Sequence, residues 1–386
     1  MKIRVSFIFS LATLVLTLVF WLLALNMKET FWDIEVYQFA VDSVNAGTDP
    51  YRNRSGFDFM YHPIILPILQ TLDLIFPLKV ILPSVYIIAL MCLFSALNHW
   101  KLIPNSFNKD EKIVLGTLLL GYFGWGYLGI LSGNLSLLGH TILHIFGLQL
   151  MLKKQTILQF TFFFIVLAFS LIKPYFLAYI VLYLVFSVFK LLLVGVVATV
   201  SFLALWIFFA VNNNDSYSQF TSNLTRGTFT NDDLGFSLFS TLQAFLGFWP
   251  AITLHFTLVL FLVAIYLKNK SLLSKNSQIV WLIVVAVISN PRVKEYDAIF
   301  LLIMAYIAAA LSSTVVKKLI LKTLTLTSFF GVVFVLIITY LFTQPLVVPL
   351  FTVALMALVW SIWFALRNTG VANEWALSGS NRRPTD

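Results

Sequence analysis

The chain has 386 residues, of which 60% are hydrophobic and only 11% are charged, and its mean hydropathy is +0.93. Soluble globular proteins average about 45–50% apolar and about 25% charged residues, so this composition excludes an ordinary soluble protein. The net charge of +9 has no soluble basic face to lie on, which excludes a nucleic-acid-binding protein. With a single cysteine, Cys92, an intramolecular disulfide is excluded too.

Apolar runs of about 20 residues recur along the chain, and each is long enough to cross a bilayer as a helix. The first run is longer than a signal-peptide core and no small-residue cleavage site follows it, so we predict an uncleaved span. The fold class predicted is an all-α polytopic membrane protein with about twelve transmembrane helices. Their predicted ranges are 5–25, 79–98, 112–131, 134–152, 156–172, 174–189, 191–211, 251–267, 277–290, 296–313, 319–341 and 346–366.

Basic residues predict how these spans are oriented, because cytoplasmic loops are enriched in Lys and Arg. Every short loop on the side of the N-terminus is basic, whereas most Asp and Glu residues fall on the other side. Both termini are therefore predicted to be cytoplasmic. Residues 1–386 form one integral membrane domain, with long extracytoplasmic loops at 26–78 and 212–250 and a cytoplasmic tail at 367–386.

The first outer loop begins FWDIEVYQFAVDSVNAGTDPY, residues 31–51. Its apolar residues have helical spacing, which predicts an amphipathic helix of about three turns lying in the outer membrane interface. Asp33 is expected at the N-cap of this helix, and Gly47 is expected to end it. Residues 63–76 are too short to span and contain prolines, so they indicate a re-entrant or interfacial segment.

Two carboxylates lie in the first turn of this predicted helix, Asp33 and Glu35. Asp33 alone could be nothing more than a helix cap, since Asp is common there. Glu35 adds a second carboxylate near the membrane surface, where it could act as a base or bind a divalent metal. The pair is therefore a candidate for chemistry at the outer surface.

Other outer-side polar residues could converge on the same place, including Tyr61, His62 and Asn134. His140 and His144 follow Asn134 on one predicted span at i, i+4 spacing, which suits a metal ion. No third ligand is near in sequence, so hydrogen bonding between helices is the preferred interpretation. His255, near the outer end of a later span, fits either interpretation equally.

Cations on the outer side are unusual under the rule that orients the spans. Lys173, in Ile-Lys-Pro-Tyr, could be an anchor whose long side chain reaches the interface, or it could be functional. The turn that begins at Asn290 carries Arg292, Lys294, Tyr296 and Asp297 between two apolar spans. A merely solvated turn would not need cations there, so the turn is predicted to bind an anion.

At these residues the sequence resembles glycosyltransferase family 87, membrane proteins of GT-C fold that include phosphatidylinositol-mannoside mannosyltransferases. The first outer loop resembles the family's pattern. Two later stretches also resemble it: SGNLSLLGH is similar to the family's Gly-Gln-x-Asn stretch without the Gln, and LIKPY is similar to its Lys-Pro. The family's late outer loop is matched in position by NPRVKEYD. His62 stands where the family often has proline. The matching positions in the first loop are Asp33, Tyr37, Gly47, Asp49, Pro50, Tyr51, Tyr61 and Pro63.

The resemblance implies a hexosyltransferase of the bacterial cytoplasmic membrane that moves a mannose-like sugar from a polyprenyl-phosphate carrier to a lipid or glycan acceptor. It implies Asp33 as the catalytic base, with Glu35 as its substitute or as a group that orients a metal or hydroxyl. Outer-face cations suit a phosphate leaving group, and inversion follows from direct displacement. The expected substrate-binding residues are Tyr37, Tyr61, His62, Asn134, His140, Lys173, Arg292, Lys294, Tyr296 and Asp297.

A different class of function remains open at this point, namely a transporter or flippase for a lipid-linked or small amphiphilic solute. Transporters usually place charged residues near the membrane midplane on broken helices of related halves. Here the polar residues cluster on one side and no internal repeat is apparent. A structural subunit of an envelope assembly is a third, non-catalytic interpretation.

Overall fold

The computed structural model describes residues 8, 11–12, 15, 32–51, 59–99, 111, 114, 132–153, 155–212, 214–229, 235, 237–341 and 347–380. These described residues form helices joined by short turns, and no strand occurs among them. The helices are α2 (Trp32–Asn45), α3 (Ile65–Ile75), α4 (Leu78–His99), α7 (Leu135–Lys153), α8 (Thr156–Ile172), the 3₁₀-helix η2 (Pro174–Val185), α9 (Val188–Asn212), α10 (Asn214–Phe229), α11 (Leu238–Leu246), α12 (Phe248–Asn269), the short η3 (Lys270–Leu272), α13 (Lys275–Ile288), α14 (Glu295–Leu311), α15 (Thr314–Leu341) and α16 (Val347–Ser380).

From residue 79 onward, helices lie where the sequence predicts spans within the described residues, which leaves the predicted span 112–131 untested. Four stretches within the described residues are long and apolar enough to cross a membrane: Leu78–Leu97, Val188–Asn212, Phe248–Leu272 and Phe351–Asn368. The apolar helices α7, α8, η2, α13 and α14 are shorter. The expected spans at 5–25 and 112–131 lie almost entirely outside the described residues, so the count of twelve stays a prediction.

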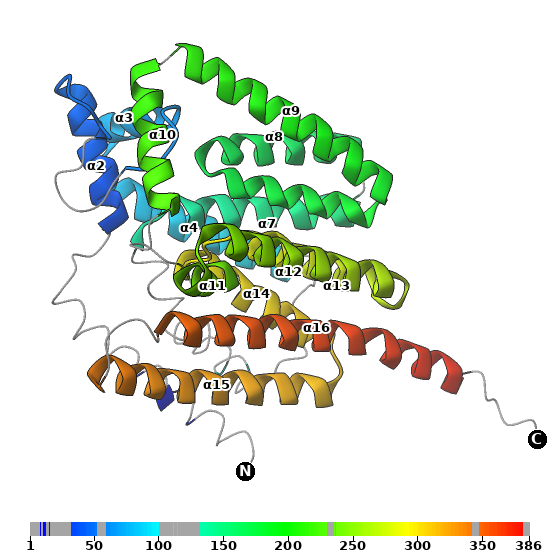
Figure 1. The fold of residues 1–386 in the computed structure, drawn as a ribbon. Helices are drawn as coiled ribbons and strands as arrows, with labels where there is room; N and C mark the ends of the chain where they lie inside the picture. The colour runs from blue at the N-terminus through cyan, green and yellow to red at the C-terminus, as the bar shows by residue number, and fades with distance from the viewer. Residues whose placement is uncertain are drawn as a thin grey trace, which may run out of the picture.

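The long helices lie roughly side by side in a stack, and α2, α3 and α10 gather at one end of it (Figure 1). The turn between η2 and α9 falls at Phe186–Ser187, three residues before Lys190. The predicted boundary between the spans 174–189 and 191–211 therefore lies close to the observed turn, with Lys190 in the first turn of α9.

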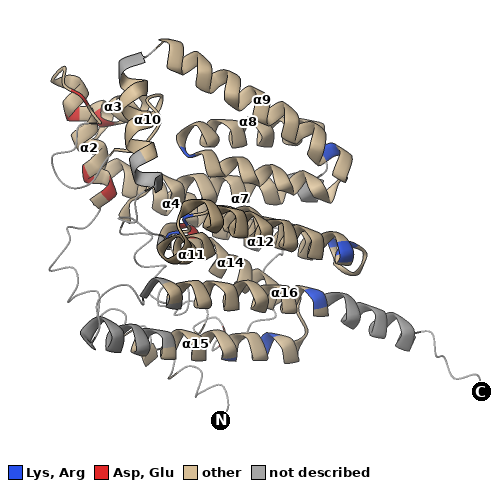
Figure 2. Ribbon diagram, in the orientation of Figure 1, with Lys and Arg blue, Asp and Glu red and all other residues tan. Residues whose placement is uncertain are grey.

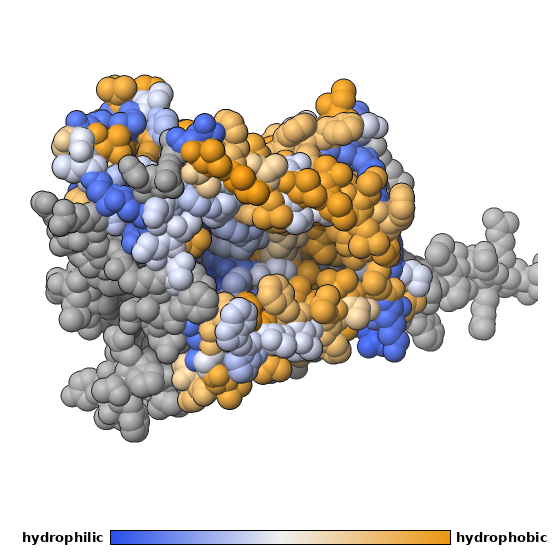
Figure 3. Space-filling view, turned by 45° about the horizontal axis from the view of Figure 1, so that its top comes forward, coloured by the Kyte–Doolittle hydropathy of each residue, from blue (hydrophilic) through white to orange (hydrophobic). Residues whose placement is uncertain are grey.

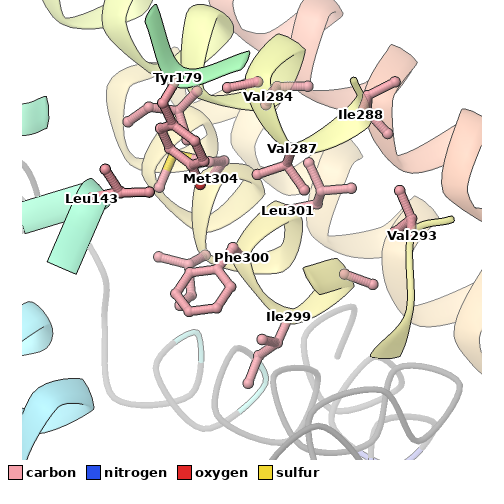
Figure 4. Close-up of a cluster of buried hydrophobic side chains, with 14 of the residues drawn as sticks. Leu143, Tyr179, Val284, Val287, Ile288, Val293, Ile299, Phe300, Leu301 and Met304 are labelled. Carbon is pink, nitrogen blue, oxygen red and sulfur yellow. The ribbon is translucent and has the colours of Figure 1, made fainter. Parts of the chain in front are cut away.

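The centre of the bundle is formed by α13 and α14, which are apolar on all sides, as a fully enclosed helix must be. Every residue of α13 from Ile279 to Ile288 is buried, and Figure 4 shows Phe300 and Met304 of α14 and Tyr179 of η2 among the side chains of this core. In contrast, α9 leaves most of its apolar side chains exposed, among them Phe189, Leu193 and Phe208. A helix this apolar and this exposed needs lipid around it.

Acidic residues gather on α2 and α3 at one end of the stack, and basic residues are drawn both near that end and toward the other end of the long helices (Figure 2). The orientation of the helices in the membrane stays a prediction from the sequence.

Two features of the outer loops differ from the sequence prediction. The helix α2 begins at Trp32, so Asp33 lies inside its first turn and is not its N-cap. The second outer loop, predicted at 212–250 with no helix assigned to it, contains α10 and α11. The length rule for membrane spans misses them, because α10 is polar and α11 has only 9 residues.

Candidate functional site

The first element of the site is α2. The sequence correctly predicted which face of this helix is buried, but not that other helices of the protein cover it. Ile34, Tyr37, Ala40 and Val41 are all fully buried, and α2 packs against α3 and α4. The helix therefore buries its apolar face in protein, whereas the sequence predicted that this face would lie in the membrane interface. As a result Asp33 is held in a fixed place against the bundle.

The chain turns sharply after α2, as the sequence predicts. Gly47 has φ of +68°, a conformation that glycine adopts without a side-chain clash. Asp49 accepts a hydrogen bond from the backbone N–H of Tyr51 at 2.8 Å, which makes a local turn. Asp42 is exposed. These two acids therefore serve the turn and the solvated face, while Asp33 is directed toward the bundle.

Asn134 connects Asp33 to the body of the protein. Its side-chain Nδ2 donates to Asp33 Oδ2 at 3.1 Å. Its Oδ1 accepts from three donors: the Ser136 backbone N–H at 2.9 Å, the Ser136 hydroxyl at 2.7 Å, and Lys173 Nζ at 3.0 Å. Because three donors converge on one atom, the amide can point only one way. A carboxylate and an ammonium are thus held one amide group apart.

Lys173 lies at the break between α8 and η2, where its extended backbone separates the two helices. Its ammonium lies 5.1 Å from the ring centre of Tyr61, 5.9 Å from that of Tyr175 and 4.9 Å from that of Tyr296. Aromatic rings attract a cation at these distances. The lysine is therefore part of an inward-facing cluster, which favours the functional interpretation over that of an interfacial anchor.

Tyr37 and Tyr61 form a second layer beneath the carboxylate. Their hydroxyls share a hydrogen bond of 2.7 Å, and Tyr37 Oη also accepts from the backbone N–H of Leu135 at 3.1 Å. Burial raises the pKa of both phenols well above 10, and the nearby Asp33 carboxylate adds to the effect. Both tyrosines therefore keep their protons and act as neutral hydrogen-bonding groups.

Asp297 is the deepest acid of the cluster and is completely buried. Its Oδ1 accepts from His140 Nε2 at 2.8 Å and from the Tyr175 hydroxyl at 3.1 Å. Its Oδ2 accepts from Asn290 Nδ2 at 2.9 Å and from the backbone N–H of Lys294 at 3.0 Å. A buried carboxylate needs several such donors. Asp297 therefore organises the cluster and fixes the start of α14.

His140 makes hydrogen bonds to other helices, as preferred from the sequence, whereas the shortest hydrogen bond of His144 lies within α7. His140 Nδ1 lies 2.6 Å from the Tyr179 hydroxyl, while His144 Nδ1 lies 2.6 Å from the His140 carbonyl and must donate to it. Tyr179 can then donate to His140, whose Nε2–H donates to Asp297. Among the described residues no group of three or more His, Cys, Asp and Glu side chains could hold a metal ion.

The turn with Arg292 and Lys294 closes one side of the cluster through its backbone. Asn290 accepts from the Arg292 backbone N–H at 3.0 Å, and the Ser237 hydroxyl of α11's N-cap donates to the Pro291 carbonyl. The Arg292 side chain reaches Gln243 of α11 at 3.5 Å. The turn is therefore held by α11, an element that the sequence did not predict.

Glu35 and His62 lie apart from this network. Glu35 forms an ion pair of 2.8 Å with Lys79, both partners being substantially exposed. His62 is fully buried among the rings of α9 and α10, namely Trp206, Phe209, Tyr217 and Phe220. Burial lowers the pKa of His62 to about 4, so it is neutral at pH 7. His62 therefore packs α9 and α10 against the site instead of facing Asn134.

Among the cluster residues that were not predicted site residues, three lie beside a predicted one: Ser136, Tyr175 and Asn290. The Tyr175 hydroxyl lies 2.8 Å from the Ser136 hydroxyl, which connects the Asp297 side of the cluster to Asn134. Each lies within three residues of a predicted site residue, in Asn-Leu-Ser, Lys-Pro-Tyr and Asn-Pro-Arg. Polar residues beside a predicted site were therefore the signal that could have identified them.

A recess with a hydrophilic floor opens on the face between α9 and α12, and apolar side chains border it (Figure 3). Comparison of the chain with protein-family models, with curated proteins and with solved structures gives no match. The site is therefore interpreted from its own geometry.

Proposed function

We propose that the protein is an integral membrane glycosyltransferase that moves a sugar from a polyprenyl-phosphate carrier to a hydroxyl acceptor on the extracytoplasmic face. The observation that carries the proposal is the Asp33–Asn134–Lys173 arrangement. It holds a candidate general base and a candidate phosphate-binding cation one amide apart. Displacement of a sugar from a phosphate needs these two groups, one on each side of the sugar carbon.

In the proposed reaction, Asp33 removes the proton of the acceptor hydroxyl as its oxygen forms a bond with the anomeric carbon. The bond between that carbon and the phosphate oxygen breaks, and the lipid phosphate leaves with the electron pair. Lys173 stabilises the charge that develops on the phosphate. Because the acceptor attacks opposite the leaving group, the product has inverted stereochemistry.

The location of the cluster also supports this proposal. It lies at the acidic end of the stack, where the first outer loop meets α7 and η2, and apolar surface lies nearby (Figures 2 and 3). Nucleotide sugars are made in the cytoplasm, and the sequence has no glycine fingerprint for binding one. A sugar used on the outer side would therefore arrive on a lipid. We propose a mannose-like hexose as the sugar and a lipid or glycan as the acceptor.

The test is transfer of radiolabelled sugar from a short-chain polyprenyl-phosphate mannose to a lipid acceptor by purified protein in nanodiscs. The expected result is an acceptor-linked product with the opposite anomeric configuration. Binding of the carrier without transfer, together with its movement across a proteoliposome membrane, would instead support a flippase. Transfer by wild type and by Asp33→Asn at equal rates would contradict the proposed role of Asp33.

A further inference from the structure

The helix that follows Lys173 has an unusual form. Residues Pro174–Val185 make a 3₁₀-helix of 12 residues. At its ends, the N–H of Phe176 donates to the Lys173 carbonyl at 3.1 Å, and the N–H of Phe186 donates to the Tyr183 carbonyl at 3.0 Å. Runs of 3₁₀-helix longer than 3–4 residues are uncommon, because their hydrogen-bond geometry is poorer than that of an α-helix. Contacts from neighbouring elements must therefore favour this form.

Two glycines of α7 receive side chains of η2. A Cβ atom at Gly139 would lie 2.6 Å from Cζ of Phe176, and one at Gly147 would lie 2.7 Å from Cδ2 of Leu182. Real Cβ contacts are not this short. Both side chains therefore approach the α7 backbone at places where any larger residue would exclude them.

The spacing of these contacts agrees with the 3₁₀ form of η2 better than with an α-helix. Gly139 and Gly147 are eight residues apart, which is about 12 Å along an α-helix. Phe176 and Leu182 are six residues apart, which is about 12 Å along a 3₁₀-helix but about 9 Å along an α-helix. Six residues also complete two 3₁₀ turns and so return to the same face, whereas in an α-helix they point to different faces.

Neither side chain has room to step aside. The Phe176 ring, only 1% exposed, lies 4.9 Å from the centre of the His140 ring, 4.7 Å from that of Tyr175 and 5.7 Å from that of Phe169. Leu182 is fully buried, and its neighbour Phe162 would lie 3.5 Å from a Cβ at Gly147. Filling either glycine position would therefore push η2 away from α7.

Both ends of η2 are also tied to other elements by lysines. At the end near the site, Lys173 donates to Asn134 at the start of α7. At the other end, Lys270 Nζ donates to the carbonyls of Leu184 and Val185 at 2.9 and 3.2 Å. These bonds fix the two ends of η2 relative to its neighbours, so a change in its length would displace Lys173.

We propose that Gly139 and Gly147 are positioning residues, which hold η2 in its long 3₁₀ form and thereby place Lys173 beside Asn134 and Asp33. Only the effect on sugar transfer rests on the proposed function. The geometric part concerns the length of η2 and can be measured in a protein of any activity.

The experiment measures the length of η2 by the distance between two spin labels. In a Cys92→Ser background, cysteines replace the exposed Pro174 and the half-buried Val185, the first and last residues of η2, which lie 11 positions apart. That separation corresponds to about 22 Å in a 3₁₀-helix and about 16 Å in an α-helix. The same labelled pair is then measured in Gly139→Ala and Gly147→Ala proteins. The matched control is Gly195→Ala on α9, where an added Cβ meets nothing within 4 Å.

The expected result is the longer distance in wild type and in Gly195→Ala, with a shift of about 6 Å toward the shorter value in both test variants. The double variant Gly139→Ala/Phe176→Leu removes the Phe176 ring atom that would lie 2.6 Å from the added Cβ at residue 139. It should recover the longer distance. A wild-type distance near the α-helical value of about 16 Å, or identical distances in every variant, would overturn the inference.

Transfer assays on the same unlabelled variants separate the two proposals. With the proposed function correct, Gly139→Ala should lower kcat by about 10²-fold with a smaller change in donor KM, because a displacement of about 1 Å costs that much. The rescue variant should regain most of the loss. If the distances shift as expected but wild type transfers no sugar, the positioning of η2 is supported and the proposed function alone fails.

Discussion

The side-chain amide of Asn134 donates a 3.1 Å hydrogen bond to the carboxylate of Asp33, although the two residues are 101 positions apart in the chain. The same amide accepts from Lys173 through its oxygen. The acid of the first outer loop and the cation of a later helix boundary are therefore coupled through one group. A substitution of Asp33 should therefore alter the surroundings of Lys173, and the reverse also holds.

Asp33→Asn should abolish most sugar transfer. An asparagine at 33 can still accept the bond from Asn134 through its amide oxygen, but it cannot take up a proton. Loss of a general base lowers rate about 10²–10⁴-fold. Asp42→Asn is the matched control, because the same change is made on the same helix at an exposed position. Initial rates of labelled transfer, measured on both proteins at equal folded concentration, decide the matter. A normal rate in Asp33→Asn would shift the role of base to Glu35.

Lys173→Ala should weaken use of the lipid-phosphate donor by about 1.5–3 kcal/mol, the usual worth of a charge-assisted hydrogen bond. Lys79→Ala provides the control, because Lys79 is an exposed cation of the same region that pairs with Glu35 and such pairs are worth about 0–1 kcal/mol. The measurement is kcat/KM for the donor.

Arg292→Ala and Lys294→Ala test the other two predicted phosphate ligands in the same assay. The expected loss is again about 1.5–3 kcal/mol for each. Since Arg292 also reaches Gln243, Gln243→Ala shows how much of its effect comes from the support of the turn. Unchanged donor kinetics in the Arg292, Lys294 and Lys173 variants together would remove a cationic phosphate site from the proposal.

His62 should make the stability of the protein depend on pH between about 4 and 6.5. Its pKa of about 4 in the folded protein lies below the ordinary 6.5, so the unfolded chain binds more protons in this window. The stability is fully present above pH 6.5 and falls as the pH is lowered through this window. His62→Phe fills the aromatic surroundings without a titrating group. Its apparent Tm should fall less steeply with acidification, and equal slopes in the two proteins would contradict the assignment.

The sidedness of the charges predicts which loops can be labelled from which side of the membrane. In a Cys92→Ser background, a cysteine at the exposed Ser271 should react with an impermeant reagent only after the cells are opened. A cysteine at the exposed Asp42 should react in intact cells. The opposite pattern would reverse the proposed orientation, and reaction of both from one side would show a miscounted span.

Hydrophobic pattern accounts for much of the fold, because long apolar helices differ so clearly from the segments between them. The face of α2 followed from its periodicity, and Ile34, Tyr37 and Val41 are buried. What packs against this face did not follow from the sequence, because no local feature distinguishes lipid from protein as the neighbour of an apolar helix face. The polar helix α10 was missed for the related reason that a rule based on hydropathy detects only apolar helices.

The candidate site was predictable as a set of residues but not as a network. Charges of the disfavoured sign drew attention to Lys173, Arg292 and Lys294, yet only the tertiary structure distinguishes their surroundings. The Lys173 ammonium bonds to Asn134, while the Arg292 side chain reaches α11. Similarly, the sequence could not predict that Asp297 is a buried acid with four hydrogen-bond donors whereas Asp33 is not, because two of those donors come from distant segments of the chain.

The sequence predicts that residues 174–189 cross the bilayer, and on that prediction the length of η2 relates the cluster to the thickness of the bilayer. Twelve residues extend about 24 Å as a 3₁₀-helix but only about 18 Å as an α-helix, against a hydrocarbon layer of about 30 Å. Lys173 and Lys270 anchor the two ends of this short rod. A thinner or thicker membrane would therefore compress or extend the element that carries Lys173, so lipid chain length becomes a variable to control whenever this protein is assayed.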